Sequence, residues 1–252
     1  MDFLNWNDEA YLGGEGVLTG CDERQEWMLK CWWDHYSKTN SHPVTFFDFG
    51  MSKSARLWCE KRGHTISFSL SNTFMKENEP FPLPKTWTPK QKSGALSQRK
   101  IWFTKAFSLL QTPYENSLWT DLDCQVKGSL TPLLRWGSFG VAEDYFETSK
   151  EWKKVGYLPQ DAVGYQAGVI VFKRHSPIIN AWLKNCYLNR KEDFSDQSIL
   201  SKTLHHQPFS FHSIPSIYNW IDPEKENPDA VIVHHAGNIL KRKILKELGL
   251  HG

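Results

Sequence analysis

Several features that define whole classes of protein are missing from this chain. No run of about 18 apolar residues occurs, so no segment is long enough to cross a bilayer as a helix. The N-terminal stretch from Met1 to Glu9 has neither the basic start nor the apolar run of a signal peptide. From these absences we expect a cytoplasmic protein without a transmembrane segment.

The sequence also lacks paired cysteines. Its five cysteines form no Cys-x-x-Cys pair, and they are Cys21, Cys31, Cys59, Cys124 and Cys186. An odd number of scattered cysteines favours reduced and mostly buried thiols over a disulfide framework or a zinc knuckle.

A strong surplus of charge is absent as well. The chain carries 30 basic and 28 acidic side chains, for a formal net charge of +2. This balance is too even for a protein that binds nucleic acids or membrane surfaces through charge alone. Glycine-rich phosphate loops are also missing, because Gly13-Gly14-Glu15-Gly16 precedes the first expected strand and no Gly-Lys-Ser/Thr sequence occurs. Any bound nucleotide must therefore be held by a metal ion and by helix N-termini.

Tryptophan, in contrast, is abundant, with 12 among the 252 residues. Such a surplus can build a packed core or provide flat rings that stack on sugars. Six of these residues fall within expected helices or strands and are predicted to be core: Trp27, Trp32, Trp58, Trp102, Trp119 and Trp182. Three others lie on or beside expected loops, where stacking on a sugar competes with core packing: Trp87, Trp152 and Trp220.

Short β-rich runs alternate with helix-length segments, which is typical of a mainly parallel sheet covered by helices. Strands are expected at residues 16–19, 44–49, 65–68, 117–120, 168–172 and 230–233. Helices are expected over 23–36, with Asp22 as its cap, and over 52–61, 97–110, 178–187, from 196 onward, and over 240–248. Segment 79–89 is expected to be an extended loop, because its prolines at 80, 82, 84 and 89 cannot continue a helix or a strand. Segment 144–160 is expected to be a long loop, and loops of that length are usually functional or disordered. The pattern predicts a single α/β domain over residues 1–252, with C-terminal embellishments.

The most informative tripeptide is Asp121-Leu122-Asp123, which directly follows an expected apolar strand. Ligands of open parallel sheets bind beyond the carboxyl ends of the strands. Two carboxylates separated by one residue at such an end can both face one Mg²⁺ or Mn²⁺, and these ions commonly bridge to phosphates. The competing interpretation is a turn with two solvated acids.

A histidine pair, His234-His235, follows the last expected strand, so that one imidazole could reach the same crevice and bind the metal. The alternative is a surface or capping role. Lys241, Arg242, Lys243 and Lys246 come next, and they form either a solvated helix face or a phosphate contact.

Together these segments resemble glycogenin-like retaining glycosyltransferases with the GT-A fold. The resemblance begins with the helix around Lys105 and the Asp-x-Asp motif. It continues, in the family's order, with Tyr165 to Val171, Phe194 to Leu200, Ile214 to Asn219 and Val231 to Gly237. It covers roughly residues 16 to 245. It divides the single GT-A domain into an N-terminal extension (1–15), a nucleotide-binding half (16–130) and a sugar and acceptor half (131–252).

The resemblance implies a metal site and a donor site. Asp121, Asp123 and His234 would bind the Mn²⁺ or Mg²⁺ that holds the diphosphate of a nucleotide sugar, with a UDP-sugar as the expected donor. Gly20 and Cys21 replace polar residues of the family, and Lys241 lies one position later than the family's phosphate lysine. The residues assigned to the donor are Leu18, Gly20, Cys21, Asp22, Lys105, Leu122, Gly237 and Lys241.

The reaction implied by the resemblance is hexosyl transfer to an unknown acceptor, with retention at the anomeric carbon. Asp196, Gln197 and Gln166 would lie near the reacting sugar, and Gln166 replaces the family's asparagine. Asp196 could equally be the N-cap of the following helix. Two other functions stay open: phosphoryl transfer of the haloacid-dehalogenase type, which also uses a strand followed by Asp-x-Asp, and non-catalytic binding of carbohydrate or nucleotide sugar.

Overall fold

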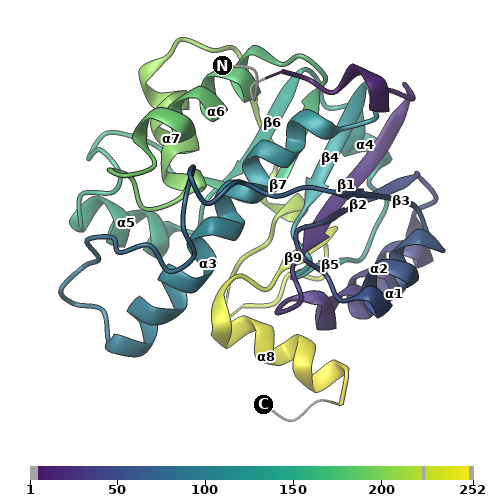
Figure 1. Ribbon diagram of the computed structural model, residues 1–252, viewed down its shortest axis with the longest axis horizontal. Helices are drawn as coiled ribbons and strands as arrows, with labels where there is room; N and C mark the ends of the chain where they lie inside the picture. Colours follow the sequence, from purple (N-terminus) through teal and green to yellow (C-terminus); the bar gives the residue numbers. More distant parts are fainter. Residues whose placement is uncertain (1–4, 223–224, 250–252) are drawn as a thin grey trace.

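The computed structural model describes residues 5–222 and 225–249 and contains a central sheet of seven strands. In spatial order these are β3 (His64–Ser67), β2 (Val44–Asp48), β1 (Glu15–Cys21), β4 (Asn116–Thr120), β7 (Tyr165–Lys173), β6 (Phe139–Glu143) and β8 (His212–Ser213). Strand β7 pairs antiparallel with both of its neighbours, and every other pairing in this sheet is parallel. The predicted α/β fold with a mainly parallel sheet is confirmed (Figure 1).

A second, two-stranded sheet joins distant parts of the sequence. Strand β5 (Cys124–Val126) pairs antiparallel with β9 (Ile232–His234), and this register places Cys124 opposite His234. The segment that follows the Asp-x-Asp motif therefore lies beside the histidine pair. The prediction that these two segments share one crevice depends on this small sheet, which the sequence did not reveal.

Eight α-helices accompany the strands in the described residues. They are α1 (Leu29–Thr39), α2 (Lys53–Glu60), α3 (Pro89–Ser108), α4 (Thr131–Leu134), α5 (Phe146–Lys154), α6 (Pro177–Asn189), α7 (Asp196–His206) and α8 (Gly237–Glu247). Short 3₁₀ turns cover Asp8–Ala10, Glu26–Met28, Leu109–Gln111 and Ser216–Tyr218.

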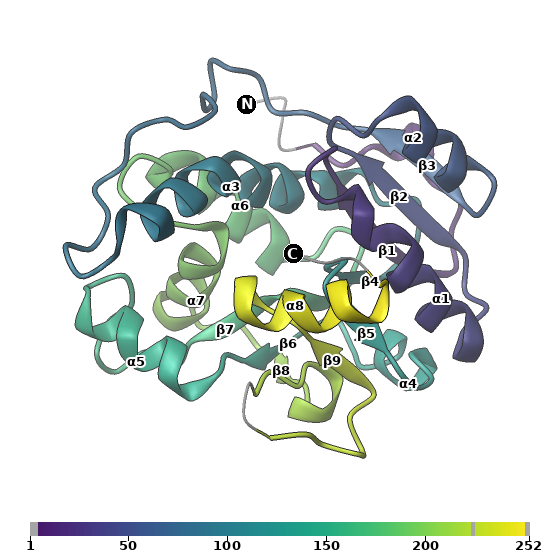
Figure 2. The same cartoon turned by 90° about the horizontal axis from the view of Figure 1, so that it is seen from below.

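The helices form two layers, because the buried side chains separate into two clusters. One cluster contains residues of α1, α2, α4 and α8, and the other contains residues of α3, α6 and α7. Figure 2 shows α3, α6 and α7 on one side of the molecule and α1 and α2 on the other. This three-layer arrangement leaves the edge that contains the carboxyl ends of β1 and β4 available for a ligand.

The tryptophan surplus contributes to the core only in part. Trp32, Trp119 and Trp182 are at most 1% exposed, as predicted. Trp32 stacks on Tyr36 with ring centroids 5.0 Å apart, and its indole N–H donates to Thr120 Oγ1 at 3.2 Å. The other three tryptophans of the predicted core group are only half-buried: Trp27, Trp58 and Trp102. All five cysteines are free and buried, which confirms the expected reduced thiols.

Two helix starts differ from the prediction. The first helix begins at Leu29 after a 3₁₀ turn, and Met28, not Asp22, occupies its N-cap position. The Asp22 carboxylate instead accepts from the backbone N–H of Arg24 at 3.1 Å and pairs with the Arg24 guanidinium at 2.6 Å. Local hydrogen bonds of an aspartate compete with capping of a helix, and here they form a turn before the helix.

The helix expected at 97–110 begins eight residues earlier, at Pro89. Proline is tolerated at the first helical position, where its missing N–H would have no partner. Thr88 and Gln91 form a reciprocal capping box around it, so the proline that was expected to end regular structure starts the longest helix.

The predicted loop 144–160 contains helix α5. None of the residues of α5 is buried, and only two of its nine residues, Phe146 and Trp152, are apolar, so no apolar stripe indicates a helix there. Helix α7 begins at Asp196, and its N-cap is Ser195, whose side chain accepts from the Ser198 N–H at 3.1 Å. Asp196 is therefore not the cap, and its carboxylate is free for another role.

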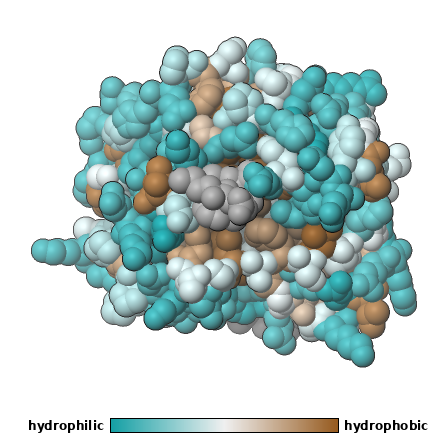
Figure 3. Space-filling model, turned by 45° about the horizontal axis from the view of Figure 1, so that its top comes forward, coloured by the Kyte–Doolittle hydropathy of each residue, from teal (hydrophilic) through white to brown (hydrophobic). Residues whose placement is uncertain are grey.

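Within the described residues, no helix combines the length and apolar character that a membrane crossing requires. The large exposed hydrophobic residues are dispersed along the chain: Tyr11, Leu12, Leu57, Phe146, Val163 and Leu188. The face in Figure 3 is largely hydrophilic around its rim and carries a hydrophobic area near its centre.

Candidate functional site

The Asp-x-Asp motif forms a tight turn at the carboxyl end of β4. The backbone N–H of Asp121 donates to the Gly168 carbonyl of the neighbouring strand β7 at 2.8 Å. The Trp119 indole N–H donates to Asp121 Oδ1 at 2.6 Å, and the Asp123 carbonyl accepts from the His235 N–H at 2.8 Å. Backbone and indole contacts thus fix both carboxylates at the edge where a parallel sheet binds its ligand.

Asp123 and His234 have the geometry of two metal ligands. His234 Nε2 lies 3.3 Å from Asp123 Oδ1, and both residues are at least 93% buried, with exposed fractions of 3% and 7%. The other ring nitrogen, Nδ1, lies 2.9 Å from Asn219 Oδ1, an oxygen that only accepts hydrogen bonds. With the proton on Nδ1, the lone pair of Nε2 faces a carboxylate oxygen, which is the tautomer that a metal-binding histidine adopts. Asp123, Cys124 and His234 each place one ligand atom within 4.8 Å of the others, whereas Asp121 Oδ1 contacts Trp119 and Lys105. If Asp121 also turned toward the ion, two carboxylates and one imidazole would fit Mn²⁺ or Mg²⁺.

Lys241 of α8 approaches the same carboxylate from the other side. Its Nζ lies 3.0 Å from Asp123 Oδ2. Burial alone would raise the pKa of Asp123, but the Lys241 ammonium lowers it far below its usual value. Asp123 is therefore ionised at every working pH, as a metal ligand must be. The neighbouring His235 is held neutral, because burial lowers its pKa to about 4.

Lys105 connects the Asp-x-Asp turn to α7. Its ammonium lies 3.5 Å from Asp121 Oδ1 and 3.4 Å from Asp196 Oδ2, and it donates to the Ala167 carbonyl at 3.2 Å. Burial alone would lower the pKa of Lys105, but the two carboxylates raise it above its ordinary value. The ammonium is thus permanently charged between an Asp-x-Asp carboxylate and the predicted sugar-binding aspartate.

Asp144 is a site residue that the sequence did not reveal. It follows β6 and accepts from the side-chain amides of Gln166 at 3.3 Å and Gln197 at 3.0 Å. Gln197 Oε1 in turn accepts from the Ala167 N–H at 3.1 Å. The carboxylate therefore holds both predicted glutamines in place. Strand β6, which carries this residue to the edge of the sheet, was missing from the predicted elements, so no signal pointed to Asp144.

The protonation of Asp144 predicts a pH dependence of stability. Burial raises the pKa of Asp144 to about 7. Hydrogen bonds from the Tyr145 N–H and the two glutamines favour the ionised form and lower the pKa, but burial has the larger effect. At pH values between the unfolded and the folded pKa of Asp144, the folded protein binds more protons than the unfolded protein. The contribution of Asp144 to stability is therefore lost as the pH rises toward 7. We expect the Tm of the wild type, relative to that of Asp144→Asn, to fall from about pH 5 to about pH 8. A difference that stays constant over this range would contradict the raised pKa.

The position of the His234 ring requires a glycine at position 168. A Cβ at this position would lie 2.2 Å from Cε1 of the imidazole. Gly168→Ala should therefore displace His234, lower the free energy of unfolding by about 1–3 kcal/mol and weaken Mn²⁺ binding. Gly94→Ala is the matched control, because a Cβ there meets nothing within 4 Å and alanine favours its helix. Isothermal titration with Mn²⁺ checks the prediction, and equal Mn²⁺ affinities of the two variants would contradict it.

Several of the other residues predicted to contact the nucleotide sugar have buried side chains. Leu18 and Cys21 are 0% exposed and Leu122 is 5% exposed, all within the core clusters. Any contact of these residues with a nucleotide sugar would come from the backbone. A Cβ at Gly20 would lie 2.7 Å from Cβ and the carbonyl oxygen of Phe47, so close strand packing requires glycine there. Gly237 has a φ of 77° and begins α8, four residues before Lys241.

Two of the three loop tryptophans have defined neighbours. The Trp87 ring packs edge-on against Phe194, as does Trp102, and Tyr157 stacks on the same ring at 5.1 Å. Trp87 is therefore part of an aromatic cluster that joins the proline-rich segment to the turn before α7. Trp220 lies in the wall of a cavity of about 270 Å³ together with Gln125, Lys127 and His235.

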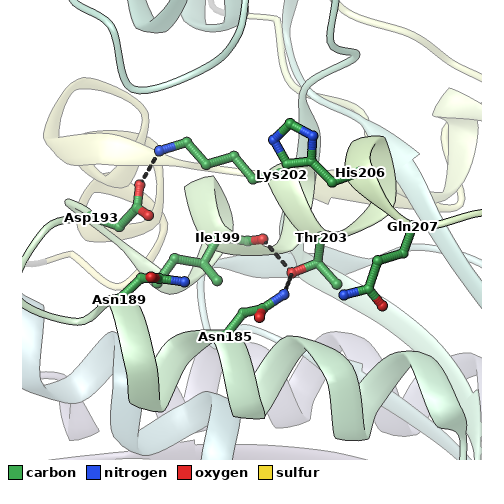
Figure 4. Close-up of a pocket in the computed structure, with 8 residues that line it drawn as sticks. All are labelled: Asn185, Asn189, Asp193, Ile199, Lys202, Thr203, His206 and Gln207. Atoms are coloured by element: carbon green, nitrogen blue, oxygen red, sulfur yellow. Dashed lines mark hydrogen bonds and ion pairs between the residues drawn. The ribbon is translucent and has the colours of Figure 1, made fainter.

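A second cavity, of about 350 Å³, opens between α6 and α7 away from the Asp-x-Asp motif (Figure 4). Four of its eight lining side chains bond one another: Asn185 Nδ2 donates to Thr203 Oγ1 at 2.9 Å, and Lys202 pairs with Asp193. Neither the Asp-x-Asp carboxylates nor His234 reaches it. The chemistry-bearing residues are thus gathered at the sheet edge, not in this cavity.

Comparison with solved structures identifies the fold. The galactosyltransferase LgtC, solved with donor and acceptor sugar analogues, superposes with a TM-score of 0.56 over 89% of this chain and 87% of its own, at 16% identity. The chain has the GT-A glycosyltransferase fold. GlyE from Streptococcus pneumoniae gives a TM-score of 0.54 at 17% identity, over 89% of this chain and 55% of its own. Mouse xyloside xylosyltransferase 1 gives 0.51 at 13% identity, over 82% of this chain and 87% of its own.

Sequence comparison gives no corresponding result: no protein-family model and no curated protein matches the chain. The likeness is therefore one of GT-A architecture. It confirms the fold that the ordered motifs predicted.

Proposed function

We propose that this protein is a metal-dependent hexosyltransferase that uses a nucleotide-diphosphate sugar, with a UDP-sugar as donor, and retains the anomeric configuration. The observation that carries the proposal is the convergence of His234 and Lys241 on Asp123, the second aspartate of the Asp-x-Asp turn after β4, in a GT-A fold. The solved complex of LgtC with donor and acceptor sugar analogues supports the same class of substrate.

Asp121, Asp123 and His234 would hold a Mn²⁺ or Mg²⁺ ion. When bound, this ion supplies Lewis-acid stabilisation of the charge that develops on the departing nucleoside diphosphate. Lys241, which now pairs with Asp123 at 3.0 Å, is 25% exposed at its side chain and is placed to bind a diphosphate oxygen. Lys105 pairs with Asp121 Oδ1 at 3.5 Å from the protein side.

The sugar would lie between β7 and the start of α7. Asp196 is 2% exposed and faces Lys105, so it can accept hydrogen bonds from donor hydroxyls without serving as the helix cap. Gln197 and Gln166 are held by Asp144 and present amide groups beside it. In this proposal Gln197 and Gln166 orient the sugar, and Asp144 is a positioning residue for both.

A donor panel tests the function. Purified protein with Mn²⁺ is incubated with nucleotide sugars that differ in base and sugar, and release of nucleoside diphosphate is measured. We expect slow hydrolysis of one donor, abolished by EDTA and restored by Mn²⁺. Release of inorganic phosphate from phosphomonoesters, with no donor hydrolysed, would replace this proposal with phosphoryl transfer.

The two rival functions are less consistent with the observations. The matched fold is that of glycosyltransferases and not of haloacid-dehalogenase phosphatases. A carbohydrate-binding module would need free aromatic platforms, but Trp87 packs on Phe194 and three of the other tryptophans are in the core. Thermal stabilisation by free glycans without any response to nucleotides would nevertheless favour a binding module over the transferase.

A further inference from the structure

A second group of possible metal ligands lies where α1, β5 and α8 meet, apart from the proposed donor site. It consists of Cys31 and His35 on α1 and Glu247 at the end of α8. One ligand atom from each residue lies within 4.8 Å of the other two. Figures 1 and 2 show the C-terminal part of α8 directed toward α1. This arrangement joins the first helix of the domain to its last.

The local structure explains how the three side chains meet. Cys31 and His35 are four residues apart on one helix, so they project from the same face one turn apart. His35 Nε2 lies 2.5 Å from Glu247 Oε1. Cys31 is 6% exposed and packs in the same core cluster as Ile244 of α8, whereas the carboxylate of Glu247 is 45% exposed. The group is thus closed on the sulfur side and open on the carboxylate side.

Gln125 of β5 supports these ligands. Its amide nitrogen lies 2.9 Å from His35 Nε2 and 3.2 Å from Glu247 Oε2. One imidazole nitrogen cannot both donate to a carboxylate and accept from an amide, so the contacts at Nε2 compete for the same position. A cation between Nε2 and the carboxylate removes this conflict and leaves Gln125 as a hydrogen-bond partner of Glu247 Oε2.

We propose that Cys31, His35 and Glu247 bind a structural Zn²⁺ ion. A thiolate, an imidazole and a carboxylate form a ligand set that zinc prefers, at roughly 2.3 Å for sulfur and about 2.0–2.2 Å for nitrogen and oxygen. The oxygen-rich Asp121 and Asp123 site instead suits Mn²⁺ or Mg²⁺. To bind zinc, the partly exposed Glu247 carboxylate moves away from Nε2 by about 1 Å to reach tetrahedral spacing. A water molecule or the Gln125 oxygen completes the coordination.

The role of this ion is to fix α8 on α1. Helix α8 also carries Lys241, whose ammonium contacts Asp123 in the candidate active site. Zinc at the end of α8 therefore keeps Lys241 close to Asp123 without contacting Lys241 itself. The proposal does not depend on hexosyl transfer, because zinc binding is measured without any substrate.

Cobalt substitution tests the site. The reduced protein is stripped of metal and titrated with Co²⁺, and a thiolate-to-cobalt charge-transfer band is recorded. We expect one equivalent of cobalt to produce this band in the wild type. Cys31→Ser should abolish it. The matched control is Cys124→Ser, since Cys124 is also buried and belongs to the other group of candidate ligands, with Asp123 and His234.

Zinc affinity and thermal stability provide the second readout, which keeps the test decisive if Cys31→Ser folds poorly. Glu247→Gln should weaken zinc binding at least about tenfold and remove the increase in Tm that zinc gives the wild type and Cys124→Ser. A charge-transfer band that survives Cys31→Ser and is lost in Cys124→Ser would place the metal at Asp123 and overturn the proposal. So would the absence of any band, or zinc affinity unaffected by Glu247→Gln.

Discussion

Replacing Asp123 by asparagine is expected to lower donor hydrolysis by roughly 10²–10³-fold while leaving the fold intact. The substitution keeps the shape of the side chain but removes the charge that faces both His234 Nε2 at 3.3 Å and Lys241 Nζ at 3.0 Å. Without this carboxylate the metal loses a ligand, and the two basic groups lose their common partner. Steady-state release of nucleoside diphosphate, measured over a range of Mn²⁺ concentrations, gives the loss directly.

Asp193→Asn is the matched control for this prediction. Asp193 has the same exposed fraction as Asp123, 7%, and also pairs with a lysine, Lys202, but it lines the cavity between α6 and α7. We expect this variant to hydrolyse the nucleotide sugar at a rate within about twofold of wild type, because Asp193 lies away from the proposed nucleotide-sugar site. If both variants lost activity equally, the effect of Asp123→Asn would be one of folding and not of metal binding.

Replacing Lys105 by methionine is expected to lower the free energy of unfolding by about 3–5 kcal/mol and to abolish donor hydrolysis. The lysine is the shared cation of Asp121 and Asp196, and Asp196 is only 2% exposed. Removal of the ammonium leaves a buried carboxylate without a counter-charge, which costs more than the ion pair itself contributes. Urea denaturation in the presence of EDTA measures the loss without any contribution from metal binding.

Two further variants show where this loss originates. Lys105→Met/Asp196→Asn should recover part of the lost stability but none of the activity, because it neutralises the unpaired carboxylate and also removes a sugar-binding group. Lys202→Met removes a more exposed ammonium, 28% against 10% for Lys105, and leaves a carboxylate that is 9% exposed against 3% for Asp196, so it should cost less, about 1–2 kcal/mol. A Lys105→Met protein as stable as Lys202→Met would mean that Lys105 does not compensate these carboxylates.

Much of the fold was predictable because its helices and strands carry local signals. Strands β1, β2, β4 and β7 are apolar runs bounded by turn residues, and each was predicted within a few residues of its observed position. Helix α5 and strand β6 were missed for different reasons. The first has only two apolar residues among its nine, Phe146 and Trp152, and the second is a strand of only five residues that contains Gly140. The start of α3 was wrong because Pro89 was interpreted as a break and not as a first helical residue.

The site was predictable where residues that can bind a metal directly follow or end a predicted strand. Asp121 and Asp123 follow a strand, His234 ends another, and the structure brings His234 next to Asp123 through the β5 and β9 pair. Asp144 and Asn219 could not be predicted, because their roles depend on contacts with Gln166, Gln197 and His234 from other elements. The same limit applies to Cys31 and His35, whose third partner lies at the other end of the chain. Counting cysteines excluded a zinc knuckle but not a site with a single cysteine.

The central claim is that Asp121, Asp123 and His234 bind a divalent cation that holds a nucleotide diphosphate. Its most direct test is equilibrium binding of UDP by isothermal titration, with and without Mn²⁺, for the wild type and for Asp123→Asn. We expect Mn²⁺ to tighten UDP binding at least about tenfold in the wild type, or about 1.4 kcal/mol, and to have no such effect in Asp123→Asn. UDP binding that is equally tight in EDTA, or equally enhanced by Mn²⁺ in both proteins, would contradict it.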